Sequence, residues 1–186
     1  MRSLYFKEKI KFTGEQLVPH WTYMNFDILG DSIVAFVGPC ELEEKYLIGI
    51  DHLKKKTQIR SEMMLHFLVE HFDLDLEKAV LRQKLLVSIL KDKLNHRLKG
   101  DIFQRWGNDI YEEDFKLTIS TVTKSSVSTK IHLGINISSK NVPVKAKGLS
   151  DYGIDPDDIA EVVMNQYRLD MRRIKERLAR TRSIGS

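Results

Sequence analysis

Side chains able to bind or activate a ligand are concentrated between Gln104 and Ser138, in the segment QRWGNDIYEEDFKLTISTVTKSSVSTKIHLGINIS. A polar loop opens this segment, and two strand-like runs separated by a serine-rich turn complete it. Five of its charged, amide or imidazole side chains could point into one concavity: Asn108, Asp109, Lys116, His132 and Asn136. The segment therefore predicts a polar pocket built on a hairpin.

The two strand-like runs, Phe115–Val122 and His132–Ser138, alternate between apolar and polar residues, and alternate residues of a strand face opposite sides of its sheet. A turn at Ser125 and Ser126 would pair Ser120 with His132, Thr118 with Gly134 and Lys116 with Asn136. The polar faces would then coincide, and Gly134 would leave room for a close approach to the backbone. A solvated face of an antiparallel sheet would carry the same residue types, so the pattern alone leaves both interpretations open.

The rest of the chain supplies the elements that must position this hairpin. Alternation and short apolar runs predict strands at Leu4–Phe12, Ser32–Val37 and Tyr46–Ile50. Helical spacing predicts helices at Ile59–Phe72, from the capping residue Asp75 to about Leu98, and from the Asp155-Pro156 start to about Leu178. Connections of hairpin length favour an α+β fold with a mainly antiparallel sheet and helices packed on one side.

Two of these helices have features that suggest partners. The helix after Asp75 carries two apolar stripes on nearly opposite sides, which predicts that it lies between layers or against a second subunit of a homodimer. The closing helix ends in the basic residues Arg172, Arg173, Lys175, Arg177, Arg180 and Arg182. These residues suit the negative end of a helix dipole as a solvated tail, and contact with RNA is the alternative.

The composition of the 186 residues predicts one soluble domain spanning residues 1–186. The net charge of +4 is too small to argue for nucleic acid by itself. The single cysteine, Cys40, excludes an intrachain disulfide and fits a reducing cytoplasm. The N-terminal residues do not have the pattern of a signal peptide, and no apolar run approaches the roughly 20 residues of a membrane span.

Two further groups could carry chemistry. Glu62, His66 and Glu70 recur every four residues and could bind a metal from one helical face, but a solvated or intersubunit polar stripe is the simpler interpretation. Cys40 follows a Gly-Pro turn and could act as a nucleophile, but a buried structural thiol is the simpler interpretation. The sequence therefore predicts no metal site and leaves the role of Cys40 open.

Three short motifs resemble those of biotin protein ligases. Arg105-Trp106-Gly107-Asn108-Asp109-Ile110 is similar to the K-W-P-N-D-[IL] segment of that family. Lys116-Leu117 stands where the family has its K-[LIV]-x-G strand, and Leu133-Gly134-Ile135-Asn136-Ile137 is similar to its I-G-I-G-I-N-[VL] strand. Over the whole chain, the order of segments resembles an archaeal domain-of-unknown-function family, number 366, placed on the same fold.

The resemblance implies the fold shared by biotin and lipoate ligases and class II aminoacyl-tRNA synthetases. It also implies roles for single residues. Lys116 would contact the carboxylate being activated and the neighbouring phosphate, where a fixed cation would stabilise developing charge. Asn108 and Asp109 would hold the adenylate, and the remaining ligand-binding positions would be Arg105, Trp106, Thr118, His132, Gly134 and Asn136.

The Arg- and Gly-rich loop that closes over the ligand in biotin ligases has no counterpart between residues 25 and 60. Gly107 and Ile119 also replace a proline and a glycine of the family pattern. Two functions therefore stay open. One is an adenylate-forming ligase or acyltransferase that acts on a small carboxylic acid with ATP and Mg. The other is a non-catalytic relative that binds a small ligand or RNA through the same concavity.

Overall fold

The computed structural model describes residues 1–55 and 58–185, and its strands form two β-sheets. The larger sheet has the order β1-β2-β3-β8-β7. The bounds of these strands are Arg2–Phe6 for β1, Ser32–Glu41 for β2, Arg60–His71 for β3, Thr129–Asn136 for β8 and Thr118–Lys124 for β7. The smaller sheet joins β4 (Gln104–Trp106), β5 (Asp109–Glu112) and β6 (Phe115–Lys116). The β1–β2 pair is parallel and the other strand pairs are antiparallel, which confirms the predicted mainly antiparallel sheet.

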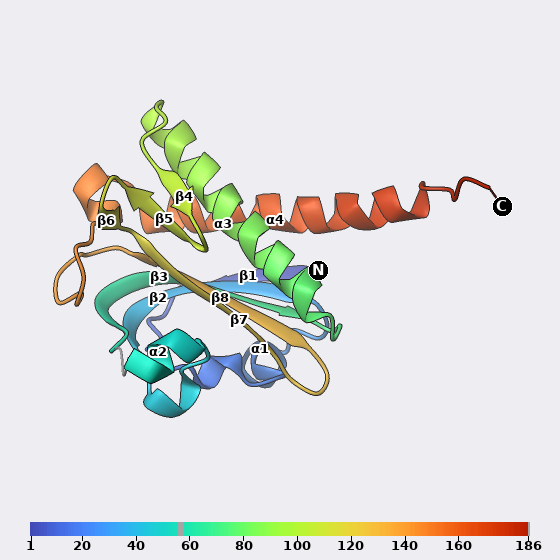
Figure 1. Cartoon of the computed structure of the whole chain (residues 1–186), viewed down its shortest axis with the longest axis horizontal. Helices are drawn as coiled ribbons and strands as arrows, with labels where there is room; N and C mark the ends of the chain where they lie inside the picture. Colours follow the sequence, from blue (N-terminus) through green and yellow to red (C-terminus); the bar gives the residue numbers. More distant parts are fainter. Residues whose placement is uncertain (56–57, 186) are drawn as a thin grey trace.

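Two long helices, α3 (Leu76–Leu98) and α4 (Pro156–Ala179), cover one face of the larger sheet, as predicted (Figure 1). The short helices α1 (Trp21–Phe26) and α2 (Ile50–Lys55) lie on the other face (Figure 1). Three 3₁₀ helices are also described: η1 (Glu15–Leu17), η2 (Glu44–Tyr46) and η3 (Leu149–Tyr152). The α+β class is therefore confirmed.

Both long helices begin at the carboxylates that the sequence indicates. The Lys78 N–H donates to Asp75 Oδ1 at 2.9 Å, and the Asp157 N–H donates to Asp155 Oδ1 at 2.7 Å. Each bond satisfies a backbone donor that has no partner within its helix. Along α3, Val87, Ile89, Leu90 and Leu94 are buried, whereas Leu76 and Leu81 are exposed. The homodimer inferred from the two stripes of α3 stays a prediction.

The central strand β3 is buried on both faces. Its odd-numbered residues face α3 and α4, and its even-numbered residues face a second core around Phe12 and Phe36. The first set is Leu65, Phe67 and Val69, and the second includes Met64 and Leu68. The sheet is therefore the middle layer of the molecule, with apolar packing above and below.

The helix predicted at Ile59–Phe72 is wrong, because Arg60–His71 form β3. An unbroken apolar run suits a strand buried on both faces as well as it suits a buried helix, and periodicity does not separate the two. Glu62, His66 and Glu70 are spaced four residues apart, which would place them on one face of a helix. Because side chains of a strand return to the same face every second residue, this spacing also places them on one face of a strand. His66 and Glu70 are buried there and Glu62 is exposed.

Two predictions near the N-terminus need correction. The strand predicted at Tyr46–Ile50 is wrong, since η2 ends at Tyr46 and α2 begins at Ile50. The strand predicted at Leu4–Phe12 is displaced, because β1 covers Arg2–Phe6 and Phe12 makes an isolated parallel bridge with Cys40. The predicted strand at Ser32–Val37 is confirmed and extends to Glu41.

The β7–β8 hairpin forms around the predicted serine turn, but its register differs by one residue from the prediction. The observed cross-strand pairs are Ser120 with Leu133, Ile119 with Gly134 and Thr121 with His132. The cause is Leu117, which interrupts the alternation between β6 and β7 and packs in the core beneath the long helices. A slip of one residue exchanges the two faces of a strand, so Ser120 lies on the α3 side, away from His132.

Candidate functional site

Two neighbouring cavities lie on the side of the sheet that carries α1 and α2, and the larger one continues around the edge strand β7 to Ser120 and to Gln83 of α3. We call the smaller one the recess and the larger one the basin; their volumes are about 90 Å³ and about 450 Å³. Cys40, Ile59 and Ile119 line both cavities and form the wall between them. The polar residues of the recess include Ser61, Lys116 and Asn136, and those of the basin include Asp51, Gln83, Asn108, Ser120, Thr121 and His132.

Besides the exposed Arg60, the recess is lined by a partly buried cationic residue, Lys116. Its Nζ lies 2.8 Å from Asp109 Oδ2, and the Thr118 hydroxyl donates to Asp109 Oδ1 at 3.3 Å. The Thr118 hydroxyl oxygen also accepts from the Ile110 N–H at 2.8 Å, which fixes its orientation. Thr118 therefore orients the Asp109 carboxylate, which in turn positions Lys116. Thr118 also lines the recess.

Burial acts against both charges of this ion pair. Burial raises the pKa of the Asp109 carboxyl above its ordinary value, although the Lys116 ammonium acts in the opposite direction. Burial lowers the pKa of Lys116, but Asp109 and Tyr111 together raise it by more, so that the net shift is upward. The lysine is therefore a fixed cation at neutral pH, which is the form that can bind an anion.

The backbone around Lys116 aims its side chain at the recess. The Leu117 N–H donates to the Ile110 carbonyl at 2.9 Å, and the Leu117 carbonyl accepts from the Asn136 N–H at 2.9 Å. These bonds direct the Leu117 side chain into the core, and Lys116 therefore points the other way. The Asn136 side chain is buried at the same cavity, and its Nδ2 donates to the Lys147 carbonyl at 3.5 Å. The structure thus brings Lys116, Asp109, Thr118 and Asn136 together.

Asn108 turns toward the basin rather than the recess. Its carbonyl accepts from the Ser120 hydroxyl at 2.6 Å, and the Ser120 oxygen accepts from Gln83 Nε2 at 2.9 Å. Lys84 Nζ donates to Asn108 Oδ1 at 3.2 Å. Asn108 and Asp109 are therefore adjacent in sequence but serve different cavities.

One buried polar atom in each cavity has no hydrogen-bond partner among the described residues. These atoms are Ser61 Oγ in the recess and Gln83 Oε1 in the basin. Leaving a buried polar group unpaired costs roughly 1–3 kcal/mol, so such groups usually mark a place that a water or ligand satisfies. Neither residue was indicated by a sequence pattern, because Ser61 lies within a run that resembles a helix and Gln83 lies within a true helix.

Arg105 and Trp106 do not reach either cavity. Arg105 Nη1 donates to the Gly107 carbonyl at 2.6 Å, and the Trp106 side chain is 77% exposed at the β4–β5 turn. Gly107 has φ of 64°, a left-handed conformation that explains the glycine at this turn. The two residues stay candidates for contact with a ligand that extends beyond the cavities.

His132 lies at the basin and is hydrogen-bonded to a second buried histidine, His66. Its Nε2 is 3.0 Å from His66 Nδ1, and His66 Nε2 is 3.1 Å from the Gly38 carbonyl oxygen. Because that carbonyl can only accept, His66 carries its proton on Nε2, and the His132 Nε2–H donates to His66 Nδ1. Burial lowers the pKa of His66 to about 4 and lowers the pKa of His132 well below its ordinary value. Both rings are therefore neutral at pH 7, and Phe12 stacks on His132 with a centroid distance of 3.7 Å.

Gly134 does not provide the open backbone that its position suggested. A Cβ added at Gly134 would lie 2.9 Å from Met64 Cε and 3.3 Å from His132 Cε1. The missing side chain therefore makes room for these two core residues rather than for a ligand. This finding corrects the interpretation of Gly134 as a point of close ligand approach.

Cys40 occupies the wall between the recess and the basin. Burial raises the pKa of its thiol to about 12, so the thiol stays protonated at neutral pH. A protonated, buried thiol is a poor nucleophile, and the structure favours the interpretation of Cys40 as a packing residue.

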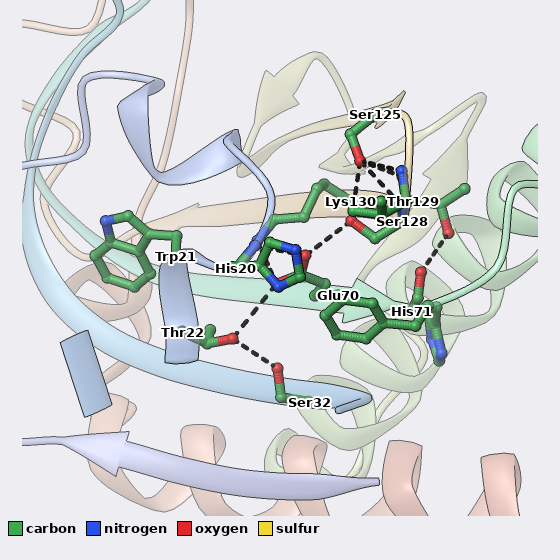
Figure 2. A network of polar contacts seen from close by, with 12 residues as sticks. His20, Trp21, Thr22, Ser32, Glu70, His71, Ser125, Ser128, Thr129 and Lys130 are labelled. Carbon is green, nitrogen blue, oxygen red and sulfur yellow. Dashed lines mark hydrogen bonds and ion pairs between the residues drawn. The ribbon is translucent and has the colours of Figure 1, made fainter. Parts of the chain in front are cut away.

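A buried ion pair beside the candidate site was not anticipated from the sequence (Figure 2). Glu70 on β3 and Lys130 on β8 are both completely buried, with 3.0 Å between Glu70 Oε2 and Lys130 Nζ. Glu70 Oε1 also accepts from the His20 N–H at 2.9 Å and from the Ser128 hydroxyl at 2.8 Å. Thr22 donates to Glu70 Oε2 at 3.4 Å. A carboxylate with this many donors is satisfied within the protein and is structural.

Neither a metal site nor a membrane span is found in the described part of the chain. No three His, Cys, Asp or Glu side chains of residues 1–55 and 58–185 come close enough together to hold a metal ion. Glu62, His66 and Glu70 are spread along an extended strand, which separates them more than a helix would. No helix within the same residues has the length and apolar character needed to cross a membrane.

Sequence comparison identifies relatives over nearly the whole chain. The sequence model of a family described as "Domain of unknown function (DUF366)" matches residues 1–182. An uncharacterized protein of Methanocaldococcus jannaschii is 39% identical in an alignment 191 residues long, which covers 97% of this chain and 84% of that protein.

Structural comparison identifies a protein of unknown function from Pyrococcus horikoshi with a TM-score of 0.93 and 34% identity, covering 98% of each chain. The biotin protein ligase of Aquifex aeolicus in complex with biotin and ATP has a TM-score of 0.62 and 15% identity, over 92% of this chain and 72% of that one. A putative lipoate protein ligase from T. acidophilum with bound lipoic acid has a TM-score of 0.61 and 10% identity, over 92% and 86%. The fold is therefore that of the biotin and lipoate ligases, as predicted.

Proposed function

The chain belongs to the DUF366 family, and we propose that it binds a small carboxylic acid in the recess, with the carboxylate on Lys116. The observation that carries this proposal is the Lys116 ammonium, which Asp109 and Thr118 hold at a cavity with a partly apolar lining. The fold neighbours support it, since the structures of the two ligases hold biotin and lipoic acid, both of which are carboxylic acids.

The recess has separate places for the two ends of such a ligand. Cys40, Ile59, Met64, Ile119 and the segment 142–144 provide the apolar lining. The carboxylate would lie against Lys116, and the unpaired Ser61 hydroxyl would give one further hydrogen bond. A charge-assisted hydrogen bond of this kind contributes about 1.5–3 kcal/mol, so the lysine alone could change affinity by roughly tenfold to a hundredfold.

Adenylation of the bound acid with ATP and Mg is the catalytic form of the proposal. The basin falls in the size range of small-molecule sites, and the unpaired Gln83 Oε1 could accept from a base amino group. Asn108 would help to position the nucleotide, and Lys116 would stabilise charge on the carboxylate as electrostatic catalyst. The described lining of the basin contains Asp51 and no lysine or arginine. The polyphosphate of ATP would therefore lack cationic partners there, which favours the non-catalytic form.

The first test is calorimetric titration with a panel of short and medium-chain carboxylic acids and their amide analogues. We expect at least one acid to bind, its amide to bind more weakly, and Lys116→Met to weaken binding of the acid at least tenfold. Lys145→Met is the matched control, because Lys145 is exposed and lies over Phe115 outside the recess. Unchanged binding in Lys116→Met would refute the proposed site.

Pyrophosphate exchange with ATP over the same panel separates the two forms. Exchange that depends on one acid would establish the adenylate-forming ligase, whereas binding without exchange would establish a non-catalytic ligand-binding relative. If the protein binds RNA and none of the acids, the result would support the alternative of a non-catalytic relative that binds RNA through the same concavity. Sedimentation analysis tests the predicted homodimer, which a purely monomeric protein would contradict.

A further inference from the structure

A concavity of about 800 Å³ lies on the other side of the sheet, between α3 and α4. We call it the helix groove. The first half of α3 forms one wall, and the second half of α4 forms the other. The end of α4 extends beyond the sheet, so the last part of this wall has no strand beneath it (Figure 1).

The core-facing stripe of α4 continues past the core into the helix groove. Ile159, Val163, Tyr167 and Met171 are buried, and the next two members of the stripe, Ile174 and Leu178, are 46% and 70% exposed. Leu81 of α3 lines the same groove and is 61% exposed. Three large aliphatic side chains from two helices are therefore left uncovered at one place, an arrangement typical of a groove that receives an amphipathic helix.

The charges around these aliphatic side chains are mainly positive. The groove is lined by Lys78, Arg82, Arg168, Arg172 and Lys175. Of its two acids, Asp31 has internal partners for both carboxylate oxygens, and Asp73 has one for Oδ2 but none for Oδ1 among the described residues. Asp73 Oδ2 lies 2.6 Å from Arg82 Nη1, and Asp31 Oδ2 lies 3.3 Å from His71 Nδ1. A partner in the helix groove would therefore contact aliphatic side chains in the middle and basic side chains on both sides.

This distribution of charge favours one occupant over the alternatives. Residues 172–182 contain six basic residues and one acid, so a second copy of the same surface would bring like charges together. Nucleic acid would match the charge but would leave the aliphatic floor unused. We propose that the helix groove binds an acidic amphipathic helix of another protein, with its aliphatic side chains against Leu81, Ile174 and Leu178 and its carboxylates against Arg168 and Arg172.

The experiment uses two displayed libraries of 18-residue helical peptides, selected against the full-length protein. Both libraries carry aliphatic residues at positions i, i+3, i+4 and i+7, and they differ in having acidic or basic flanking positions. We expect enrichment from the acidic library alone. The affinity of the selected peptides, measured by fluorescence anisotropy, should fall at least tenfold in Ile174→Ser/Leu178→Ser and in Arg168→Glu/Arg172→Glu.

Met24→Ser is the matched control, because Met24 is 78% exposed on α1, on the opposite face of the sheet (Figure 1). Circular dichroism establishes that each variant is folded, which the exposure of the substituted residues leads us to expect. Absence of enrichment from the acidic library overturns the proposal. So does concentration-dependent dimerisation that Ile174→Ser/Leu178→Ser abolishes. Binding of RNA that Arg168→Glu/Arg172→Glu removes and the aliphatic variant leaves intact would likewise overturn it.

Discussion

His66 and His132 form a hydrogen-bonded pair of buried histidines, unlike the histidines that usually lie at protein surfaces. Burial disfavours a charge on either ring. Protonating His66 would place a charge among Phe12, Phe36 and the His132 ring, where no carboxylate is in contact with it among the described residues. The stability of the fold is thus linked to the protonation states of these two residues.

This linkage predicts that the protein loses stability in mild acid. The pKa of His66 is about 4 in the folded protein and about 6.5 when unfolded, so the unfolded chain binds a proton between these values that the folded chain does not. The contribution of His66 to the free energy of unfolding is therefore fully present above pH 6.5 and is lost as the pH falls toward 4. The contribution of His66 lost between pH 7 and pH 5 is about 2 kcal/mol.

Urea unfolding of His66→Gln at a series of pH values measures this contribution. We expect the variant to lose about 2 kcal/mol less than the unmodified protein between pH 7 and pH 5. His96→Gln provides the control, because His96 is exposed near the end of α3. An identical pH dependence of the His66→Gln variant and the unmodified protein would contradict the assignment of this titration to His66.

The Glu70–Lys130 ion pair connects several elements on the α1 side of the sheet (Figure 2). Glu70 joins β3 to β8 through Lys130, to the β7–β8 turn through Ser128, and to the start of α1 through His20 and Thr22. Burial lowers the pKa of Lys130, and the Glu70 carboxylate offsets that effect only in part. One ion pair therefore orders three segments that are distant in sequence.

Removing one member of this pair should be costly. Lys130→Met leaves the Glu70 carboxylate buried without its cation, and we expect the free energy of unfolding to fall by about 3–5 kcal/mol. The double variant Glu70→Gln/Lys130→Met should be more stable than Lys130→Met alone, since a neutral amide oxygen still accepts from His20 and Ser128 without a buried charge. Chemical denaturation of the single and double variants tests both statements. A double variant less stable than Lys130→Met would show that Glu70 does not depend on Lys130.

The sequence was informative about elements wherever turn or capping residues mark their ends. The caps at Asp75 and Asp155, the strand at Ser32–Val37 and the hairpin turn near Ser125 were all predictable from local residue types. The segment Arg60–His71 was not, because burial on both faces removes the alternation that identifies a strand. The register of β7 against β8 was not predictable either, since it depends on the interruption of the strand at Leu117.

The arrangement of the whole molecule explains which site residues could be predicted. The motif residues Lys116, Asp109 and Asn136 converge because β5, β6 and β8 are neighbours in the hairpin region and close in sequence. Ser61, Cys40 and Gln83 come from β3, β2 and α3, and their place at the cavities depends on long-range packing that local patterns do not encode. The basic closing helix was predicted, but the groove that it forms with α3 required the tertiary structure.

The two faces of the sheet should be separable by shortening α4. Every described residue from Arg172 to Gly185 is exposed, so deletion of residues 173–186 removes little buried surface. We expect the free energy of unfolding to change by less than about 1 kcal/mol, the range of surface substitutions rather than core deletions. Binding of a carboxylic acid in the recess should be unchanged, while binding of an acidic helix in the helix groove should be lost. Thermal unfolding, calorimetry and anisotropy on the shortened chain measure the three quantities. A loss of several kcal/mol would show that this end of α4 is packed in solution, and loss of acid binding would show that the two faces are coupled through the sheet.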